Sequence, residues 1–307
     1  MTKVFIDGSA GTTGLRIYER LEGRPDIQLV KLSEDLRKDP AARQDAICGA
    51  DIAFLCLPDD AARESVSLAG DSKVKIIDTS TAHRCSDAWA YGFPELRGKR
   101  EKILASSRVA NPGCHASGFV ALIAPLVENG ILPASAQLSC FSLTGYSGGG
   151  KKMIAEYEAQ ARSELLKGPR QYALSQSHKH LPEMVKLCGL EQAPVFCPVV
   201  GDFYSGMEVT VPLFTSRLKG TAADIRALYA EYYKTGLVRC VHEADPDGML
   251  SAAAFSGRDD MHLGVYGNDE RIVLVSRFDN LGKGASGAAI QNMNILMGVP
   301  ETTGLNV

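Results

Sequence analysis

The sequence has no two cysteines close enough in the chain to form a zinc motif or a dithiol redox motif. Eight cysteines occur in 307 residues, and no two of them lie within four positions of each other. This spacing excludes CxxC-type motifs, and in a chain of this length it favours reduced thiols over a disulfide framework. The first residues also lack a signal-peptide pattern, so we expect a cytoplasmic protein.

Long apolar runs and a strong net charge are absent as well. No run approaches the roughly 20 apolar residues that span a membrane. Lys and Arg number 33 against 36 Asp and Glu, which gives a formal net charge of −3. This charge gives no general reason to bind nucleic acid or an anionic membrane, and we expect neither as a partner. The hydrophobic fraction of 45% is ordinary for a globular protein, and the length suffices for two domains.

The first third of the chain alternates predicted strands and helices. The strands are predicted at 3–7, 27–32, 51–57 and 74–78, and the helices at 15–22, 41–48 and 61–69. The strands are nearly continuous apolar runs, which is typical of a parallel sheet covered on both faces. We therefore expect a Rossmann-like, doubly wound α/β domain over residues 1–113.

The pattern changes after a turn-rich stretch at 79–113. Further strands are predicted at 136–144, 195–202, 207–215, 237–242 and 272–278, and helices at 151–166 and 222–234. More strands with fewer helices indicate a second, α+β domain with a mixed or antiparallel sheet over residues 114–283. A last helix at 284–298 consists largely of small residues, and we expect 284–307 to complete the first domain.

Cys114 is the strongest candidate for a reactive group. It follows Asn111-Pro112-Gly113 and precedes the apolar run 120–124, so a turn is predicted to open directly into a helix. A thiol in the first turn of a helix faces the positive end of the helix dipole, which favours the nucleophilic thiolate. The alternative is a cysteine that only packs.

A glycine-rich turn lies between the first predicted strand and helix. Its predicted cofactor-binding residues are Gly8, Ser9, Gly11, Thr12, Thr13 and Gly14. Glycines at this point of a βαβ unit allow a pyrophosphate to approach the N–H groups at the helix start. Past the second strand, Ser33 and Arg37 would receive a ribose 2′-phosphate, which favours NADP over NAD. Glu34 and Asp35 keep NAD open as an alternative.

Histidines supply the candidate proton acceptors. His178 and His180 lie two residues apart, and imidazole suits proton transfer near pH 7. A metal site made of His178, His180 and Glu183 is a weaker alternative. His115 adjoins Cys114, but we expect the helix to turn it away, which would make it structural.

Two further turns carry candidate ligands. Gly148, in a run of three glycines before Lys151, would hold phosphate or the nicotinamide end of a cofactor. Arg84 follows a predicted strand end, where it would clamp a carboxylate or phosphate. Both residues would equally suit plain solvated loops.

Six segments of the chain, taken together, resemble one known family. They are the glycine loop 8–14, Tyr91-Gly92-Phe93-Pro94-Glu95-Leu96, Asn111-Pro112-Gly113-Cys114, His178-x-His180-x-Pro-Glu183, Asp279-Asn280-Leu281-Gly282-Lys283-Gly284-Ala285-Ser286-Gly287 and Gln291-Asn292-Met293-Asn294. This order resembles the shorter form of N-acetyl-gamma-glutamyl-phosphate reductase over nearly the whole chain.

The resemblance implies an enzyme of arginine biosynthesis. Its reaction is the NADPH-dependent reduction of N-acetyl-L-glutamyl 5-phosphate to the 5-semialdehyde with release of inorganic phosphate. It implies Cys114 as the nucleophile and His180 as the general acid and base. It implies Asn280, Lys283 and Gly284 as cofactor contacts, and a homo-oligomer, expected to be a tetramer, that associates through the second domain's sheet.

The substrate pocket is the least specified part. Candidate substrate-binding residues are Arg84, Arg108, Asn111 and Glu183. The same chemistry serves an aspartate-semialdehyde dehydrogenase and an aminoadipyl-phosphate reductase, which stay open as alternatives. A non-catalytic NADP-binding sensor is the alternative from another class.

Overall fold

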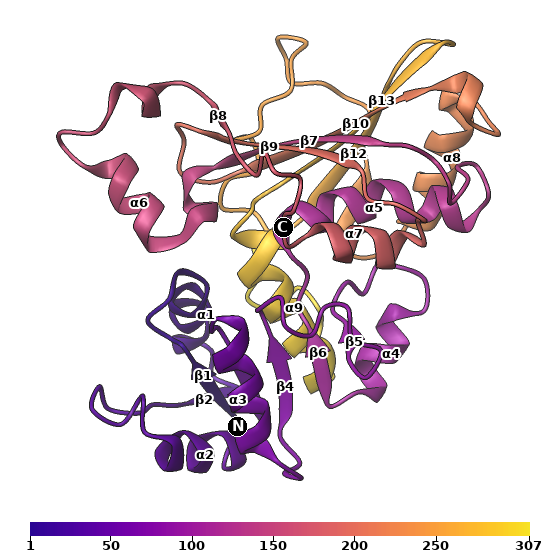
Figure 1. Cartoon of the computed structure of the whole chain (residues 1–307). Coiled ribbons are helices and arrows are strands. Elements are labelled where there is room, and N and C mark those ends of the chain that lie inside the picture. Colours follow the sequence, from indigo (N-terminus) through magenta and orange to yellow (C-terminus); the bar gives the residue numbers. More distant parts are fainter. The chain divides into compact units, whose positions relative to one another are not determined.

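The computed structural model describes all 307 residues, and the chain divides into two compact units. Unit 1 comprises Met1–Pro112 and Ala285–Asn306, and unit 2 comprises Gly113–Gly284 with Val307. Each unit is built on its own sheet (Figure 1).

Unit 1 contains a six-stranded sheet of order β2-β1-β3-β4-β6-β5 in which every neighbouring pair is parallel. The strands are β1 (Thr2–Asp7), β2 (Ile27–Val30), β3 (Ile52–Leu55), β4 (Lys75–Asp78), β5 (Ala90–Tyr91) and β6 (Arg108–Ala110). The helices are α1 (Thr12–Glu22), α2 (Pro40–Cys48), α3 (Asp59–Ala69), α4 (Lys99–Ala105) and α9 (Gly287–Met297). The strand order reverses between β1 and β3, and ligands of such sheets bind at the carboxyl ends of the strands near this point.

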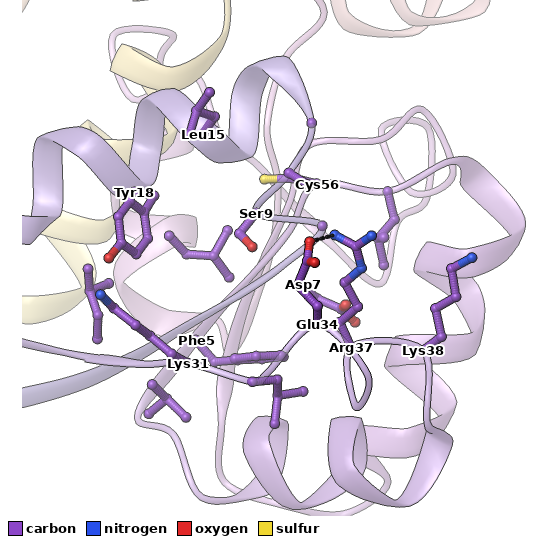
Figure 2. Close-up of a pocket in the computed structure, with 18 residues that line it drawn as sticks. Phe5, Asp7, Ser9, Leu15, Tyr18, Lys31, Glu34, Arg37, Lys38 and Cys56 are labelled. Carbon is purple, nitrogen blue, oxygen red and sulfur yellow. Dashed lines mark ion pairs between the residues drawn. The ribbon is translucent and has the colours of Figure 1, made fainter. Parts of the chain in front are cut away.

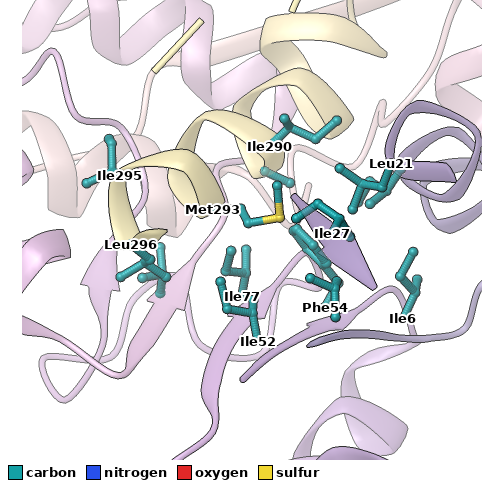
Figure 3. Packing of buried hydrophobic residues seen from close by; sticks show 14 of the residues in the cluster. Ile6, Leu21, Ile27, Ile52, Phe54, Ile77, Ile290, Met293, Ile295 and Leu296 are labelled. Carbon is teal, nitrogen blue, oxygen red and sulfur yellow. The ribbon is translucent and has the colours of Figure 1, made fainter. Parts of the chain in front are cut away.

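Apolar side chains cover both faces of this sheet. On one face, Ile52, Phe54 and Ile77 pack in one cluster with Leu21 of α1 and Met293 of α9 (Figure 3). The other face carries a second cluster that includes residues of α2 and α3, whose members are Phe5, Ala46, Ile47, Ala50, Ala53, Leu55, Ala62, Ala69, Val74 and Ile76. Because side chains alternate along a strand, both clusters draw on the same strands, which confirms the predicted doubly wound fold.

Unit 2 contains a mixed sheet of order β11-β12-β13-β10-β7-β9-β8. The strands are β7 (Ser139–Gly145), β8 (Arg170–Gln171), β9 (Val195–Gly201), β10 (Met207–Phe214), β11 (Val238–Cys240), β12 (Met261–Gly267) and β13 (Arg271–Phe278). Pairs β11–β12 and β7–β9 are parallel and the other four are antiparallel. The helices are α5 (Cys114–Glu128), α6 (Gly150–Glu158), α7 (Leu181–Cys188) and α8 (Ala222–Tyr232). This is the predicted second α+β part with a mixed sheet.

Helix α5 is the buried centre of unit 2. Residues 115–126 are all buried, and α5 packs on β10, β13, α7 and α8. Pro125 lies inside the helix and has no N–H for the carbonyl of Ala121, four residues earlier. The hydroxyl of Tyr233 donates to this carbonyl over 2.8 Å and replaces the missing donor.

Several elements differ from the prediction. The helix expected at 151–166 ends at Glu158, and a separate short 3₁₀ turn follows at Glu164–Lys167. Arg162 explains the break, because its guanidinium donates to Tyr157 O at the end of α6 and pairs with Asp202. The turn-rich stretch 79–113 holds β5, α4 and β6, and α7 and β12 were also not predicted. None of the helices combines the length and the apolar character that crossing a bilayer requires.

Candidate active site

Cys114 is the first residue of α5, as the sequence predicted. Gly113 is the N-cap, with extended backbone angles, and its carbonyl accepts the first helical hydrogen bond from Ser117 N at 2.8 Å. Its own N–H donates to Glu183 Oε1 at 2.8 Å. Glu183 is 1% exposed, so this buried carboxylate from α7 fixes the turn before the cysteine. Cys114 itself is half-exposed.

Gly284 lies directly against the cysteine. A Cβ atom on Gly284 would be 3.0 Å from Cys114 Cβ and 3.1 Å from the carbonyl oxygen of Asp279. The chain turns here in a π-helical segment, Gly282–Ser286, and Gly284 N donates to Asp279 O at 2.9 Å. The structure thus brings together two predicted site residues that are 170 positions apart in the sequence.

His178 and His180 approach one another after the short strand β8. Their ring centroids are 4.8 Å apart. His180 is buried, and its backbone N–H donates to His178 Nδ1 at 3.2 Å. Because His178 Nδ1 accepts this bond, the proton of a neutral His178 ring is on Nε2. Burial, and then the charge of Lys179, lower the pKa of His178.

The expectation that α5 turns His115 away is wrong. The His115 ring is buried, and its centroid is 5.5 Å from that of His180 and 5.6 Å from that of His178. Its ring nitrogens contact Ser142 Oγ at 2.6 Å and the Tyr172 hydroxyl at 2.7 Å. Burial lowers the pKa of His115 to about 3, so the ring is neutral at physiological pH. Nothing in the sequence pointed to Tyr172.

Four of the other thiols are poor nucleophiles. Burial raises the pKa of Cys56 to about 12 and also raises the pKa values of Cys140, Cys188 and Cys240. These four thiols therefore stay protonated near neutral pH.

The glycine loop of unit 1 has the close backbone approach that a phosphate cradle needs. Gly8 has a φ of +85°, and a Cβ there would be 2.3 Å from the carbonyl oxygen of Cys56. A Cβ on Gly14 would be 2.4 Å from the carbonyl oxygen of Gly8. Gly11 is the N-cap of α1, and Thr12 and Thr13 are its first residues, so their N–H groups lie at the helix start.

A cavity of about 640 Å³ adjoins this loop in unit 1 (Figure 2). Gly8, Ser9 and Gly11 line it, together with the aliphatic side chains of Leu15 and Leu29. Such a volume suits a small-molecule ligand. A dinucleotide fits these residues, because backbone N–H groups, a glycine turn and an apolar wall meet at the carboxyl end of β1.

Three basic residues come from the segment that follows β2. The Lys31 ammonium lies apart from the other two, over the Tyr18 ring and 3.4 Å from Glu22 Oε1 (Figure 2). Lys31, Arg37 and Lys38 line the cavity, and Arg37 pairs with Glu34 at 3.4 Å (Figure 2). Arg37 was predicted from the sequence as a cofactor contact. Lys31 was not, because it lies within the predicted strand 27–32. Ser33 is exposed and does not line the cavity.

Gly148 and Asn280 lie together in unit 2. Asn280 Nδ2 donates to Ser147 Oγ at 3.0 Å, and its Oδ1 accepts from Gly206 N at 2.9 Å. A Cβ on Gly148 would be 3.6 Å from Asn280 Nδ2. Lys283 is 1% exposed. Lysine is rarely buried to this extent unless its ammonium group is paired with another polar group.

Arg84 and Asn111 lie together in unit 1. The Arg84 guanidinium donates to Asn111 O at 2.9 Å and to Thr79 O at 2.8 Å. Asn111 Nδ2 donates to Ala285 O at 3.0 Å, and its Oδ1 accepts from Asn292 at 3.2 Å. These bonds join the carboxyl ends of β4 and β6.

Arg108 stands apart from the other candidates. It is the first residue of β6, and its guanidinium donates to Val74 O and Ser107 O at the amino ends of the strands. Ligands of parallel sheets bind at the opposite edge, so the position of Arg108 does not support the predicted substrate role.

Nowhere do three or more His, Cys, Asp or Glu residues come close enough to hold a metal ion. His178, His180 and Glu183 therefore do not form the metal site weighed as an alternative.

Family models match both parts of the chain. Residues 114–280 match the semialdehyde dehydrogenase dimerisation domain, and residues 33–105 match the semialdehyde dehydrogenase NAD binding domain. Among solved structures, aspartate semialdehyde dehydrogenase II from Vibrio cholerae aligns with a TM-score of 0.73 at 17% identity, covering 97% of this chain and 98% of that one. The aspartate semialdehyde dehydrogenase from Candida albicans, solved with NADP, aligns with a TM-score of 0.67 at 14% identity, covering 97% and 99%. At 17% and 14% identity, these alignments show that this chain has the same fold as the two dehydrogenases.

Curated relatives are much more similar in sequence. N-acetyl-gamma-glutamyl-phosphate reductase 2 from Nostoc sp. is 46% identical over 99% of this chain and 99% of its own length. N-acetyl-gamma-glutamyl-phosphate reductase from Sinorhizobium medicae is 45% identical over 96% and 98%. The chain therefore belongs to the N-acetyl-gamma-glutamyl-phosphate reductases of the semialdehyde dehydrogenase family.

Proposed function

We propose that this enzyme reduces N-acetyl-L-glutamyl 5-phosphate to N-acetyl-L-glutamate 5-semialdehyde with NADPH, in arginine biosynthesis. The observation that carries the proposal is a half-buried thiol at the first position of a buried helix, beside the tightly packed Gly284. The next residue, His115, lies with its ring near those of His178 and His180. Full-length identity of 42–46% to N-acetyl-gamma-glutamyl-phosphate reductases supports the choice of substrate.

Cys114 acts as the nucleophile. Its thiolate forms a bond to the acyl-phosphate carbon, the bond from that carbon to the phosphate oxygen breaks, and inorganic phosphate leaves a thioester behind. We assign the N–H groups in the first turn of α5 to stabilising the negative oxygen that develops in this step. NADPH, when bound, supplies the hydride that converts the thioester to a thiohemiacetal. Breaking the carbon–sulfur bond then releases the aldehyde and restores the thiolate, and the hydroxyl proton returns to the His180 ring.

His180 is the proton acceptor and donor. Its ring takes the Cys114 proton before attack and returns a proton to the oxygen that hydride transfer leaves negative. The bond from His180 N to His178 Nδ1 supports this choice, since the one unprotonated ring nitrogen of neutral His178 already accepts a backbone N–H and burial lowers the pKa of His178. His115 and His178 are both held toward the neutral state, so neither opposes protonation of His180.

Unit 1 binds NADP through the glycine loop. Gly8, Gly11 and Gly14 admit the pyrophosphate, and Ser9, Thr12 and Thr13 surround it. Arg37 and Lys38, which line the cavity, neutralise the 2′-phosphate. Ser33, which does not line the cavity, stays a predicted contact of this phosphate. The predicted contacts in unit 2 are Gly148, Asn280, Lys283 and Gly284.

Arg84 and Asn111 of unit 1 and Glu183 of unit 2 are the proposed substrate-binding residues. Arg84 and Asn111 are fixed by backbone bonds at the carboxyl ends of β4 and β6, and Glu183 acts by holding Gly113. In this proposal, residues 1–113 with 284–307 bind the cofactor, while 114–283 bind the substrate and associate with other copies.

The outer face of the unit 2 sheet supports a homo-oligomer. We also assign the enzyme to the cytoplasm, as expected from the sequence. Three large apolar side chains point out of this face: Phe141, Val195 and Phe214 are 50%, 57% and 64% exposed. Cys140 and Ser142, the neighbours of Phe141 along β7, are buried on the sheet face that α5 covers. Phe141 therefore lies on the opposite face, which is an exposed apolar surface. We assign it to contact with a second copy, within a tetramer.

One assay separates this function from its alternatives. The reaction is run in reverse, and NADPH formation from N-acetylglutamate semialdehyde is followed at 340 nm with and without inorganic phosphate. We expect sustained phosphate-dependent turnover, and little turnover with aspartate semialdehyde or aminoadipate semialdehyde. Preference for either of these would replace the proposed substrate, and NADPH binding without any turnover would indicate a sensor.

A further inference from the structure

The turn that follows β13 in unit 2 is built around one buried residue. Asp279 is 0% exposed and comes directly after β13. Its side-chain Oδ1 accepts a hydrogen bond from Leu281 N at 2.9 Å. Its backbone carbonyl accepts from Gly282 N at 3.1 Å and from Gly284 N at 2.9 Å. The side chain and the backbone of Asp279 together therefore determine the course of the turn that leads to Gly284.

The second carboxylate oxygen of Asp279 holds a neighbouring loop. Asp279 Oδ2 accepts from Gly257 N at 2.7 Å and from the Ser205 hydroxyl at 3.4 Å. Ser205 Oγ in turn contacts Ser256 Oγ at 2.5 Å. Gly257 has a φ of +81°, a backbone conformation that favours glycine. Because a buried carboxylate is costly unless donors surround it, the loop at 256–257 and the carboxylate stabilise each other.

The same loop packs tightly against the turn. A Cβ atom on Gly282 would be 1.9 Å from the carbonyl oxygen of Arg258 and 3.0 Å from Asp259 Oδ1. The turn therefore has no room to move toward the loop. Asp279 contacts the loop through Oδ2 and the turn through Oδ1, so its carboxylate also keeps the turn from moving away.

The far end of the turn packs on the cysteine at the start of α5. A Cβ atom on Gly284 would be 3.0 Å from Cys114 Cβ, so the backbone of Gly284 lies directly beside the Cys114 side chain. The place of Gly284 is set by the carbonyl of Asp279 and by the bonds that hold Asp279 to the loop. A nucleophile reacts efficiently only when it is held near the geometry of attack.

We propose that Asp279 is a positioning residue, whose carboxylate ties the turn 282–284 to the loop 256–257 and so fixes Gly284 against Cys114. The inference rests on the proposed function in one respect, the role of Cys114 as nucleophile. Asp279 is too deeply buried to touch substrate, so it acts through the turn.

The first test measures access to the Cys114 sulfur without any turnover. Alkylation by iodoacetamide is followed in the wild type and in Asp279→Asn at pH values where the rate no longer rises, and mass spectrometry identifies the modified peptide. The Asn side chain has one acceptor oxygen and one donor nitrogen, so it cannot accept from both Gly257 N and Leu281 N. One anchor is lost and Gly284 withdraws from Cys114. The plateau rate should rise at least about threefold, because thiol reactivity follows exposure.

Asp260→Asn is the matched control. Asp260 is also 0% exposed, but its carboxylate pairs with the side chains of Arg258 and His262. This variant should lower the urea midpoint of unfolding and leave the plateau rate of alkylation unchanged. A wild-type plateau rate in Asp279→Asn, or the same rise in both variants, overturns the proposal.

The second test uses steady-state turnover. Asp279→Asn should lower kcat by about 10- to 100-fold, the range expected when a reacting group is displaced by about 1 Å. Asp279→Ala loses both anchors and should lower kcat further. KM for the acyl phosphate should change less than kcat, because the buried carboxylate does not reach the substrate. Wild-type kcat in Asp279→Asn contradicts the positioning role, and this variant decides the test if Asp279→Ala does not fold.

A double variant shows whether Asp279 acts through Gly284. Gly284→Ala adds a Cβ that pushes the turn away from Cys114 and should lower kcat by itself. In Asp279→Asn the turn has already withdrawn, so the same change should cost less there than in the wild type. Losses that combine without any coupling would contradict a path through Gly284.

The two proposals fail in different ways. A wild-type enzyme without phosphate-dependent turnover would sink the proposed function, while the alkylation plateaus would still decide the role of Asp279. Wild-type alkylation and wild-type kcat in Asp279→Asn would remove the positioning role and leave the proposed function intact.

Discussion

At the level of single residues, the two histidines after β8 differ in what their ring nitrogens can do. His178 Nδ1 accepts a backbone hydrogen bond, and its pKa is lowered by burial and by Lys179. His180 is buried at the start of α7, in the same unit as Cys114. Proton transfer at the thiol should therefore depend on His180 more than on His178.

His180→Asn should lower kcat by about 10²- to 10⁴-fold, the usual contribution of a general acid or base. His178→Asn is the matched variant and should lose much less, because Asn can still accept from the backbone N–H. Steady-state kinetics on both variants decide this. Equal losses, or the larger loss in His178→Asn, would transfer the role to His178.

The sequence was sufficient to place Cys114 at the start of a helix, because a Pro-Gly turn before an apolar run is a local signal. It was insufficient for His115, which the structure places among the histidines. The direction of a side chain on α5 depends on which sheet and loop pack against it, and that information is not local. Tyr172 and Lys31 were missed for the same reason.

At the level of elements, the glycine loop before α1 has no room for side chains at its closest approach. Gly14→Ala places a Cβ 2.4 Å from the carbonyl oxygen of Gly8, which forces the turn apart. NADPH affinity should fall at least about tenfold, since the backbone N–H groups leave their positions. Gly23→Ala is the control, because a Cβ there meets nothing within 4 Å. Fluorescence titration with NADPH measures both, and unchanged affinity in Gly14→Ala would contradict the cradle.

Helix α5 depends on a donor from a distant element. Tyr233→Phe leaves the carbonyl of Ala121 without the proton that replaces the missing N–H of Pro125. The free energy of unfolding should fall by about 1–3 kcal/mol. Tyr232→Phe, at the more exposed surface, should cost less than about 0.5 kcal/mol. Urea unfolding compares the two, and equal stabilities would remove this role from Tyr233.

Most elements of unit 1 could be predicted, because its buried strands β1, β3 and β4 are short apolar runs between turn signals. Elements whose stability comes from tertiary contacts could not. β5 and β6 have two and three residues, which are too few to show an alternation of buried and exposed side chains. α7 begins directly after His180, within the segment His178–Glu183 that drew notice only for its histidines. The end of α6 at Glu158 depends on Arg162 and its partner Asp202, 40 residues later.

At the level of the whole molecule, the exposed apolar face of the unit 2 sheet predicts association. Phe141→Asp places a charge in the middle of this face and should shift the enzyme toward smaller species in analytical ultracentrifugation. Leu165→Asp is the control, since Leu165 is 75% exposed on a short turn away from the sheet. An unchanged sedimentation profile in Phe141→Asp would place the interface elsewhere.

The covalent role of Cys114 is tested most directly by trapping the thioester. The enzyme is mixed with N-acetylglutamate semialdehyde and NADP in the absence of phosphate, so that the acyl group has no phosphate acceptor, and is then digested for mass spectrometry. We predict a burst of NADPH of about one equivalent per active site and an N-acetylglutamyl group on the peptide that contains Cys114, with neither in Cys114→Ser. A burst of the same size in Cys114→Ser, or an acyl group on another residue, would contradict the account.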